Sequence, residues 1–230
     1  MGYAPHTALR EQSFADFAPD TSFCYAMSEK SKSRIGESFN FFVSLEVKND
    51  PDHRNFMNQV EEFQARTLSM FPEQQTAKAA KLSSLHITLA TLLVHEDEMA
   101  YVIQSISDAV DHFKRVYSGE DGIRCDFQGV STYRDVVFLD MGLGANAFKT
   151  CKDVLMVNGL HKYVTDQCQA PHLTYVRKLD LSEEERSAML TMMQDVKTSR
   201  ITLDTLSLRE RKVAGEPTKP PVREYTLWRE

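Results

Sequence analysis

The stretch Leu85-His86-Ile87-Thr88-Leu89-Ala90 alternates large apolar residues with His86, Thr88 and Ala90. Successive side chains of a β-strand point to opposite faces, so this alternation predicts a strand with one apolar face and one face that carries a histidine and a threonine. Pro171-His172-Leu173-Thr174-Tyr175-Val176 has the same arrangement in the second half of the chain. The sequence therefore predicts two similar strands that each present a histidine and a threonine.

Hydrophobic spacing around these two stretches predicts further strands and helices. Strands are expected over residues 39–47, 123–130, 135–141, 203–213 and 222–228. Helices are expected over residues 52–70, 97–117, 145–168 and 182–197. Because the elements alternate without a uniform parallel winding, we expect an α+β fold with two lobes built alike rather than a Rossmann sheet.

Local signals mark where some of these elements begin and end. Asn158-Gly159 disfavours a single unbroken helix over residues 145–168. Ser182 followed by Glu185 predicts a capping box at the start of the last helix. Gly215-Glu216-Pro217 predicts a turn across which the last two strands pair.

Length and composition are those of a soluble globular protein. The 230 residues can bury a substantial core, and contents of 42% hydrophobic and 26% charged residues are ordinary. Residues 1–37 lack sustained periodicity, so we expect a tail or irregular lead-in before a domain over residues 38–230. No apolar run approaches the ~18 residues that span a bilayer, and no signal-peptide layout is present, so we expect a cytosolic or nucleocytoplasmic protein without a membrane partner.

The formal net charge of −6 bears on the class of partner. Proteins that bind long nucleic acids neutralise many phosphates with a basic surface, so we expect no such partner. A short oligonucleotide or dinucleotide can still bind where positive potential is confined to a cleft, and Arg177 is a candidate for supplying it. We expect the chain to act as a monomer.

Neither a metal nor another cofactor is indicated. The four cysteines, Cys24, Cys125, Cys151 and Cys168, are scattered without a CxxC pair, which favours reduced packing thiols over a disulfide or zinc site. No HExxH or comparable ligand spacing occurs. Gly142-Leu143-Gly144 lacks the third glycine and the lysine of phosphate-binding loops.

The paired motifs fit one kind of chemistry. Phosphodiester cleavage needs one group that takes a proton from the attacking oxygen and another that protonates the leaving oxygen, and histidine can do either near neutral pH. A threonine two residues further along the same face can donate its hydroxyl hydrogen to a phosphate oxygen. The other histidines have no such motif and are interpreted as surface or packing residues: His6, His53, His95, His112 and His161.

On these motifs, with Phe41-Phe42-Val43-Ser44-Leu45 and Glu96-Asp97, the chain resembles the 2H phosphoesterase superfamily of LigT-like fold. Within it the chain most resembles the phosphoesterase domain of A-kinase anchoring proteins. The resemblance covers residues 38–230 in the order of their elements, and it implies two pseudo-symmetric lobes, each with an antiparallel sheet and helices, around a central cleft. It also implies metal-independent catalysis by His86 and His172, with Thr88 and Thr174 beside them.

The resemblance implies a substrate class as well. Several members cleave 2′,5′-linked oligoadenylates, second messengers that activate an antiviral ribonuclease, so antagonism of innate immunity is one implied role. Others open 2′,3′-cyclic phosphates or process RNA ends. By analogy with RNA-trimming members, His86 is assigned as the base and His172 as the acid. Three aromatic residues are candidates for stacking on a base: Phe41, Tyr133 and Tyr175.

Two classes of function follow. The first is a phosphodiesterase for 2′,5′-linked oligoadenylates, with 2′,3′-cyclic phosphodiesterase or RNA-end processing as sibling activities. The second is a catalytically silent nucleotide-binding module. Since a pure binder has no need of a matched acid–base pair, the intact histidines favour the enzyme.

Overall fold

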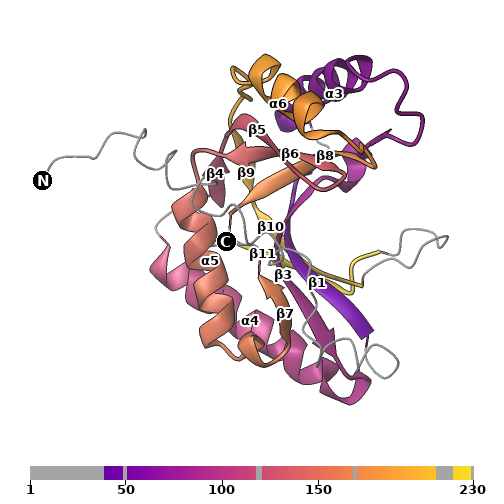
Figure 1. Ribbon diagram of the computed structural model, residues 1–230. Coiled ribbons are helices and arrows are strands. Elements are labelled where there is room, and N and C mark those ends of the chain that lie inside the picture. Colours follow the sequence, from indigo (N-terminus) through magenta and orange to yellow (C-terminus); the bar gives the residue numbers. More distant parts are fainter. Residues whose placement is uncertain (1–38, 49–50, 118–120, 168–169, 211–219, 229–230) are drawn as a thin grey trace, which may run out of the picture.

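The computed structural model describes residues 39–48, 51–117, 121–167, 170–210 and 220–228 (Figure 1). The expected lead-in over residues 1–37 and the turn at Gly215-Glu216-Pro217 lie outside this part of the chain. The strands are β1 Phe39–Glu46, β2 Lys78–Ala79, β3 His86–Val94, β4 Ile123–Cys125, β5 Phe127–Tyr133, β6 Val136–Met141, β7 Val164–Gln167, β8 His172–Arg177, β9 Ile201–Leu203, β10 Thr205–Glu210 and β11 Arg223–Thr226. The α-helices are α3 Arg54–Ser69, α4 Met99–Val116, α5 Ala145–Val157 and α6 Glu183–Met192, and the short 3-10 helices are η3 Pro51–His53, η4 Leu82–Ser84, η5 Glu96–Glu98 and η6 Leu160–Lys162.

Antiparallel pairing builds two main sheets, as the expected α+β fold requires. One has the strand order β11-β10-β1-β3-β7 and the other the order β2-β8-β6-β5, while β4 and β9 form a separate ribbon. The strands β10 and β11 pair as expected from the sequence. Each main sheet contains one of the two motif strands, and β3 and β8 contact each other where the sheets meet. The fold therefore brings the motifs together although they are far apart in the sequence.

The two lobes are not the two halves of the sequence. Helix α3 follows β1 of the five-stranded sheet but packs on β2 and β8 of the other sheet. Helix α5 follows β6 of the four-stranded sheet but packs on α4 and β3. Figure 1 shows the resulting arrangement, with α3 and α6 beside one sheet and α4 and α5 beside the other. Each lobe therefore contains a helix that follows a strand of the other lobe in the chain.

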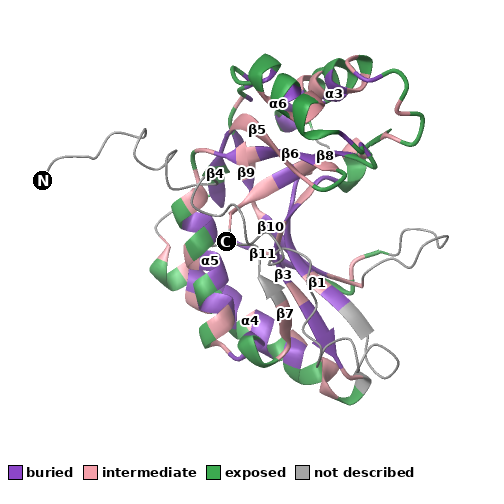
Figure 2. Cartoon of the chain, in the orientation of Figure 1, coloured by how far each residue is buried: buried purple, intermediate pink, exposed green. Residues whose placement is uncertain are grey.

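The core lies between the sheets and their helices. In Figure 2 the buried positions follow the strands and the inner sides of the helices, and exposed positions follow the outer sides of α3, α4 and α6. The side chains of Val43 and Leu45 on β1 and of Ile87 and Leu89 on β3 are fully buried. Burial of large apolar side chains contributes roughly 1.5–3 kcal/mol each, so these alternating positions fix which face of each strand turns inward.

Two helices are shorter than the sequence predicts. Helix α5 ends at Val157, where the side-chain amide of Asn158 donates to the Val154 carbonyl over 2.7 Å. The rest of the expected helix is replaced by η6 and by β7, an edge strand beside β3. Helix α6 begins at the expected capping box but ends at Met192. Its predicted last residues pair instead with β5, since the Gly129 amide donates to the Val196 carbonyl over 2.8 Å. In both places, part of the segment expected to be helical pairs with a strand instead.

Candidate active site

The motif strands have the same burial pattern at each corresponding position. In residues 86–90 and 172–176 the histidine and threonine are half-buried, whereas the residue between them and the two residues after the threonine are buried. The two catalytic candidates of each strand therefore share one partly open face. The buried residues anchor each strand in the core and hold that face in position.

Each motif strand also contains a β-bulge at the same place. Leu89 is the extra residue of β3 opposite β1, and Tyr175 is the extra residue of β8 opposite β6. A bulge places two residues against one and changes the direction of the following side chains. As a result Thr91 and Arg177, three residues after the motif threonines, are again accessible. No local pattern in the sequence indicated these bulges.

The two histidine rings are held by equivalent hydrogen bonds. His86 Nδ1 donates to the Ser84 carbonyl over 2.8 Å, and His172 Nδ1 donates to the Ala170 carbonyl over 2.9 Å. A carbonyl oxygen can only accept, so Nδ1 carries the hydrogen in both rings. In the neutral ring Nε2 then has the lone pair that can accept a proton, and in the charged ring it has a proton to give. Each histidine is therefore oriented for proton transfer at Nε2.

Burial lowers the pKa of both histidines below the ordinary value of 6.5. For His86 the backbone bond to Ser84 and the charge of Glu46 act in the opposite direction, while Arg177 and Arg209 lower the pKa further. For His172 the bond to Ala170 raises the pKa, and the charge of His86 lowers it. The two rings therefore lie within electrostatic reach of each other, and a proton on one disfavours a proton on the other.

A partly buried ion pair lies beside His86. Glu46 occupies the position directly opposite His86 in the β1–β3 pairing. Arg209 donates from Nε to Glu46 Oε1 over 3.0 Å and from Nη2 to Oε2 over 2.9 Å, and Ser44 Oγ donates to Oε1 over 2.7 Å. The bidentate arrangement fixes the carboxylate and compensates its buried charge.

The other motif has a matching neighbour. Asp140 lies directly opposite His172 in the β6–β8 pairing, and Ser131 Oγ donates to Asp140 Oδ2 over 2.5 Å. Aromatic rings flank both histidines as well: Phe42 lies 5.2 Å from the His86 ring and Phe138 lies 4.4 Å from the His172 ring, between centroids. Each histidine thus has a carboxylate opposite it and a phenylalanine against its ring.

Glu46, Asp140 and the two phenylalanines were not predicted as site residues from the sequence. Phe42, Ser44 and Glu46 follow the two-residue alternation of β1, which places them on the face opposite the buried Val43 and Leu45, so this signal was available. The positions of Asp140 and Arg209 depend on which strands pair and in which register. No local pattern in the sequence predicts this pairing or this register.

The substrate-binding candidates fall into two groups. Arg177 is exposed at the end of β8, and its charge acts on His86. Tyr133 is half-buried at the end of β5, with the Arg134 guanidinium 5.3 Å from its ring centre. Both remain candidates for contacts with substrate.

Phe41 and Tyr175 are core residues, so their prediction as substrate-binding residues was wrong. Phe41 is on the inner face of β1 and 5% exposed. Tyr175 is fully buried, and its hydroxyl is hydrogen-bonded to Thr67 Oγ1 of α3 over 3.0 Å. Regular alternation along β8 places Tyr175 on the same buried face as Leu173, opposite His172 and Thr174, so its ring lies in the core and away from the motif face.

Other features of the described residues do not compete with this site. Among them no group of three or more histidine, cysteine, aspartate or glutamate side chains is placed to hold a metal ion. Cys125 and Cys151 are buried free thiols, as expected, and Cys24 and Cys168 lie outside the described residues. His53 is buried with Nδ1 bonded to the Lys48 carbonyl over 2.9 Å, which agrees with a packing role. None of the helices in this part of the chain is long and apolar enough to cross a membrane.

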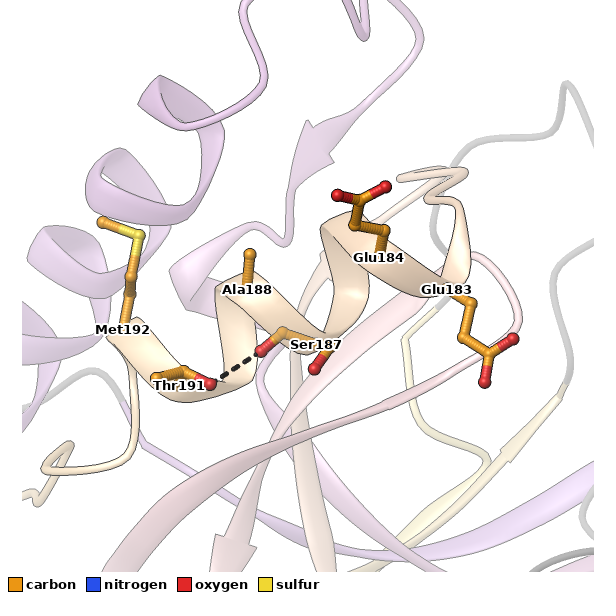
Figure 3. A pocket seen from close by; sticks show the side chains of 6 residues that line it. All are labelled: Glu183, Glu184, Ser187, Ala188, Thr191 and Met192. Carbon is orange, nitrogen blue, oxygen red and sulfur yellow. Dashed lines mark hydrogen bonds between the residues drawn. The ribbon is translucent and has the colours of Figure 1, made fainter.

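A hollow of about 820 Å³ runs along α6 (Figure 3). Six residues of that helix line it: Glu183, Glu184, Ser187, Ala188, Thr191 and Met192. No histidine lines this hollow, and its two carboxylates would repel a phosphodiester. The geometry therefore favours the face between β3 and β8 as the active site.

Comparison with known proteins agrees with the fold. Escherichia coli LigT, in a crystal structure with 3′-AMP, superposes with a TM-score of 0.58 over 84% of this chain and 100% of LigT at 15% identity. A protein of Thermus thermophilus superposes with a TM-score of 0.57 over 82% of this chain and 97% of its own length, at 15% identity. The MHV ns2 PDE domain superposes with a TM-score of 0.51 over 76% of this chain and 99% of its own length, at 17% identity. A search of curated proteins found no match.

The fold of this chain is LigT-like, and each of its two main sheets contains one His-x-Thr strand. The sequence profile of the 2′-5′ RNA ligase superfamily matches residues 49–215, and the chain belongs to that superfamily. This membership supports phosphodiesterase activity in general. The greater closeness to A-kinase anchoring proteins remains a prediction.

Proposed function

We propose that this protein is a metal-independent phosphodiesterase that cleaves 2′,5′-linked oligoadenylates or closely related short nucleotide phosphodiesters. The observation that carries the proposal is the pair of histidines, each fixed through Nδ1, on adjoining strands with a threonine on the same face. E. coli LigT, which shares the fold, has been crystallised with 3′-AMP, NADP+ and ATP, and this supports a nucleotide-sized substrate.

In a 2′,5′ linkage the free 3′-hydroxyl lies next to the phosphorus. His86 Nε2 takes the proton of that hydroxyl, and the 3′-oxygen attacks the phosphorus. The bond from phosphorus to the 5′-oxygen breaks, and His172 Nε2 gives its proton to that oxygen. The products are a 2′,3′-cyclic phosphate and a free 5′-hydroxyl, so atoms and protons balance.

Thr88 and Thr174 hydroxyls donate to the two non-bridging phosphate oxygens, whose charge increases as the attack proceeds. Arg177 adds positive potential beside His86, and Tyr133 offers a ring for a base. The phosphodiester's own negative charge raises the pKa of the acid histidine, which brings it into its protonated form when substrate binds.

The test is incubation of the protein with 2′,5′- and 3′,5′-linked adenylate dimers in excess chelator, followed by chromatography of the products. We expect faster cleavage of the 2′,5′ dimer, with a 2′,3′-cyclic product. Activity only on a 2′,3′-cyclic phosphate would instead establish the sibling enzyme. Turnover that stops in chelator and returns with added zinc or manganese would contradict the metal-independent mechanism.

A further inference from the structure

A second polar pocket lies at the end of the four-stranded sheet, one residue beyond Arg177. Its volume is about 390 Å³, within the range of small-ligand sites. Six residues line it: Thr76, Arg134, Asp135, Lys178, Asp180 and Arg186. Three of them are cations, in a protein whose formal net charge is −6.

The pocket lies at the end of the strand that carries the second motif. Arg177 is the last residue of β8, its charge acts on His86, and it is paired with Lys78 on one side and Val136 on the other. Lys178 follows at once. Four residues of regular strand span about 13 Å, and the bulge at Tyr175 shortens this, so Thr174 and Lys178 lie within reach of neighbouring nucleotides of one substrate.

Two of its cations occupy unusual backbone positions. Arg134 has φ of 52° and Lys178 has φ of 60°, and they are the only non-glycine residues with positive φ in the described part of the chain. Glycine or asparagine adopts this conformation at lower cost than arginine or lysine. Backbone conformation therefore does not explain why long cationic side chains stand at both positions, whereas a shared ligand does.

Arg186 is held where it can join them. Its Nη2 donates to the Arg134 carbonyl over 3.5 Å and to the Leu181 carbonyl over 3.4 Å, which ties α6 to the β5–β6 turn. Its Nε is buried and has no hydrogen-bond partner among the described residues. A buried donor without an acceptor is costly, and a small rotation would let Nε donate to an anion in the pocket.

The mixed charge of the pocket indicates what it binds. A purely anionic group, such as a terminal polyphosphate, would meet the carboxylates of Asp135 and Asp180 as well as the cations. A nucleotide unit offers a phosphate for the cations and ribose hydroxyls that donate to carboxylates. We infer that this pocket is a subsite for a further nucleotide of an oligonucleotide whose scissile phosphate lies between His86 and His172. This inference rests on the proposed function.

The test exploits the positive φ values. Lys178→Gly removes a cation and also relieves the backbone, so its melting temperature should not fall below that of the wild type. Arg134→Gly is the second variant; Lys178→Gly is the cleaner one because Arg134 also contacts Tyr133. Arg115→Gln, an exposed cation at the end of α4, is the control.

Affinities are measured for 2′,5′- and 3′,5′-linked adenylate dimers and trimers, and for a dimer with a 5′-triphosphate. The background is the His86→Ala/His172→Ala variant, in which substrate is not consumed. Without the pocket substitutions we expect trimer to bind roughly tenfold more tightly than dimer, the scale of one charged hydrogen bond. In Lys178→Gly the trimer should lose that advantage while the dimer is unchanged, and Arg115→Gln should alter neither.

If Lys178→Gly lowered the affinity for dimer and trimer equally, or lowered neither, the subsite would be overturned. An effect confined to the triphosphorylated dimer would overturn it in favour of a site for terminal phosphates. Failure of the proposed function has a different outcome, since the wild-type protein would then cleave no 2′,5′ linkage while binding still depended on length and on Lys178.

Discussion

Glu46 on β1 lies directly opposite His86 on β3, and a bidentate bond from Arg209 holds its carboxylate there. The charge of Glu46 raises the pKa of His86, and that of Arg209 lowers it, so the pair sets a balance at this histidine. Neither residue belongs to a His-x-Thr motif. The motif supplies the proton-transfer group, and the neighbouring strands tune it.

The first prediction concerns this pair. Glu46→Gln removes the negative charge and leaves that of Arg209, so the pKa of His86 should fall further. With His86 as base, the acidic limb of the pH profile of kcat/KM should move to lower pH. Glu224→Gln, an exposed carboxylate of β11 in the same sheet, is the control. A shift of the alkaline limb would assign the acid role to His86, and an unchanged profile would refute the coupling.

The second prediction separates catalysis from binding. His86→Ala and His172→Ala should each lower kcat by at least ~10²-fold, the scale for loss of one general acid or base. The double variant should cost little more than either single variant, because both rings act on one transition state. Affinity for the 2′,5′ dimer, measured by calorimetry, should change far less. Near-normal turnover in both single variants would mean that the two motifs are structural, whereas nucleotide binding without turnover in the wild type would favour the silent binding module.

The third prediction concerns the threonines. Thr88→Val and Thr174→Val keep the side-chain shape and remove one hydroxyl donor to the phosphate. Loss of one hydrogen bond to a charged group costs ~1.5–3 kcal/mol, so kcat should fall by roughly ten- to a hundredfold. Single-turnover rates would measure this. A change in KM alone would mean that the hydroxyls bind the ground state and not the transition state.

The fourth prediction links the histidines to stability. Their folded-state pKa values are lowered, so the unfolded chain binds more protons as pH falls below about 6.5. Their contribution to stability is fully present above that pH and is lost as pH falls through the lowered values. The side-chain amide of asparagine can donate to the same carbonyl as histidine Nδ1, and it does not titrate. The His86→Asn/His172→Asn variant should therefore lose less stability than the wild type between about pH 7.5 and about pH 5.5. Urea unfolding at both pH values measures the difference, and equal losses would contradict the assignment.

The fifth prediction tests the corrected role of Tyr175. Tyr175→Phe leaves buried Thr67 without its hydroxyl partner, so the free energy of unfolding should fall by about 1–3 kcal/mol while KM stays the same. Tyr133→Ala should do the reverse, raising KM with little change in stability. Denaturant unfolding and steady-state kinetics on both variants distinguish the roles. A raised KM for Tyr175→Phe would return that ring to the substrate site.

The sequence by itself determined the two motif strands and the faces that carry their histidines and threonines. Side-chain alternation along a strand is a local property, so Ile87 and Leu173 had to turn inward if His86 and His172 were to face outward. The capping box was predictable from the spacing of Ser182 and Glu185, and the pairing of β10 with β11 from the turn expected between these two neighbouring strands.

Only the tertiary structure decided which other residues meet the motifs. Strand pairing and register set Glu46 and Asp140 opposite the two histidines, and these contacts join residues far apart in the chain. The bulge at Tyr175 turned Val176 into the core and left Arg177 exposed, which regular alternation along β8 would have reversed. Local patterns fix the direction of a side chain within a regular strand. Where a strand bulges, and what lies across from it, depends on how the whole core packs.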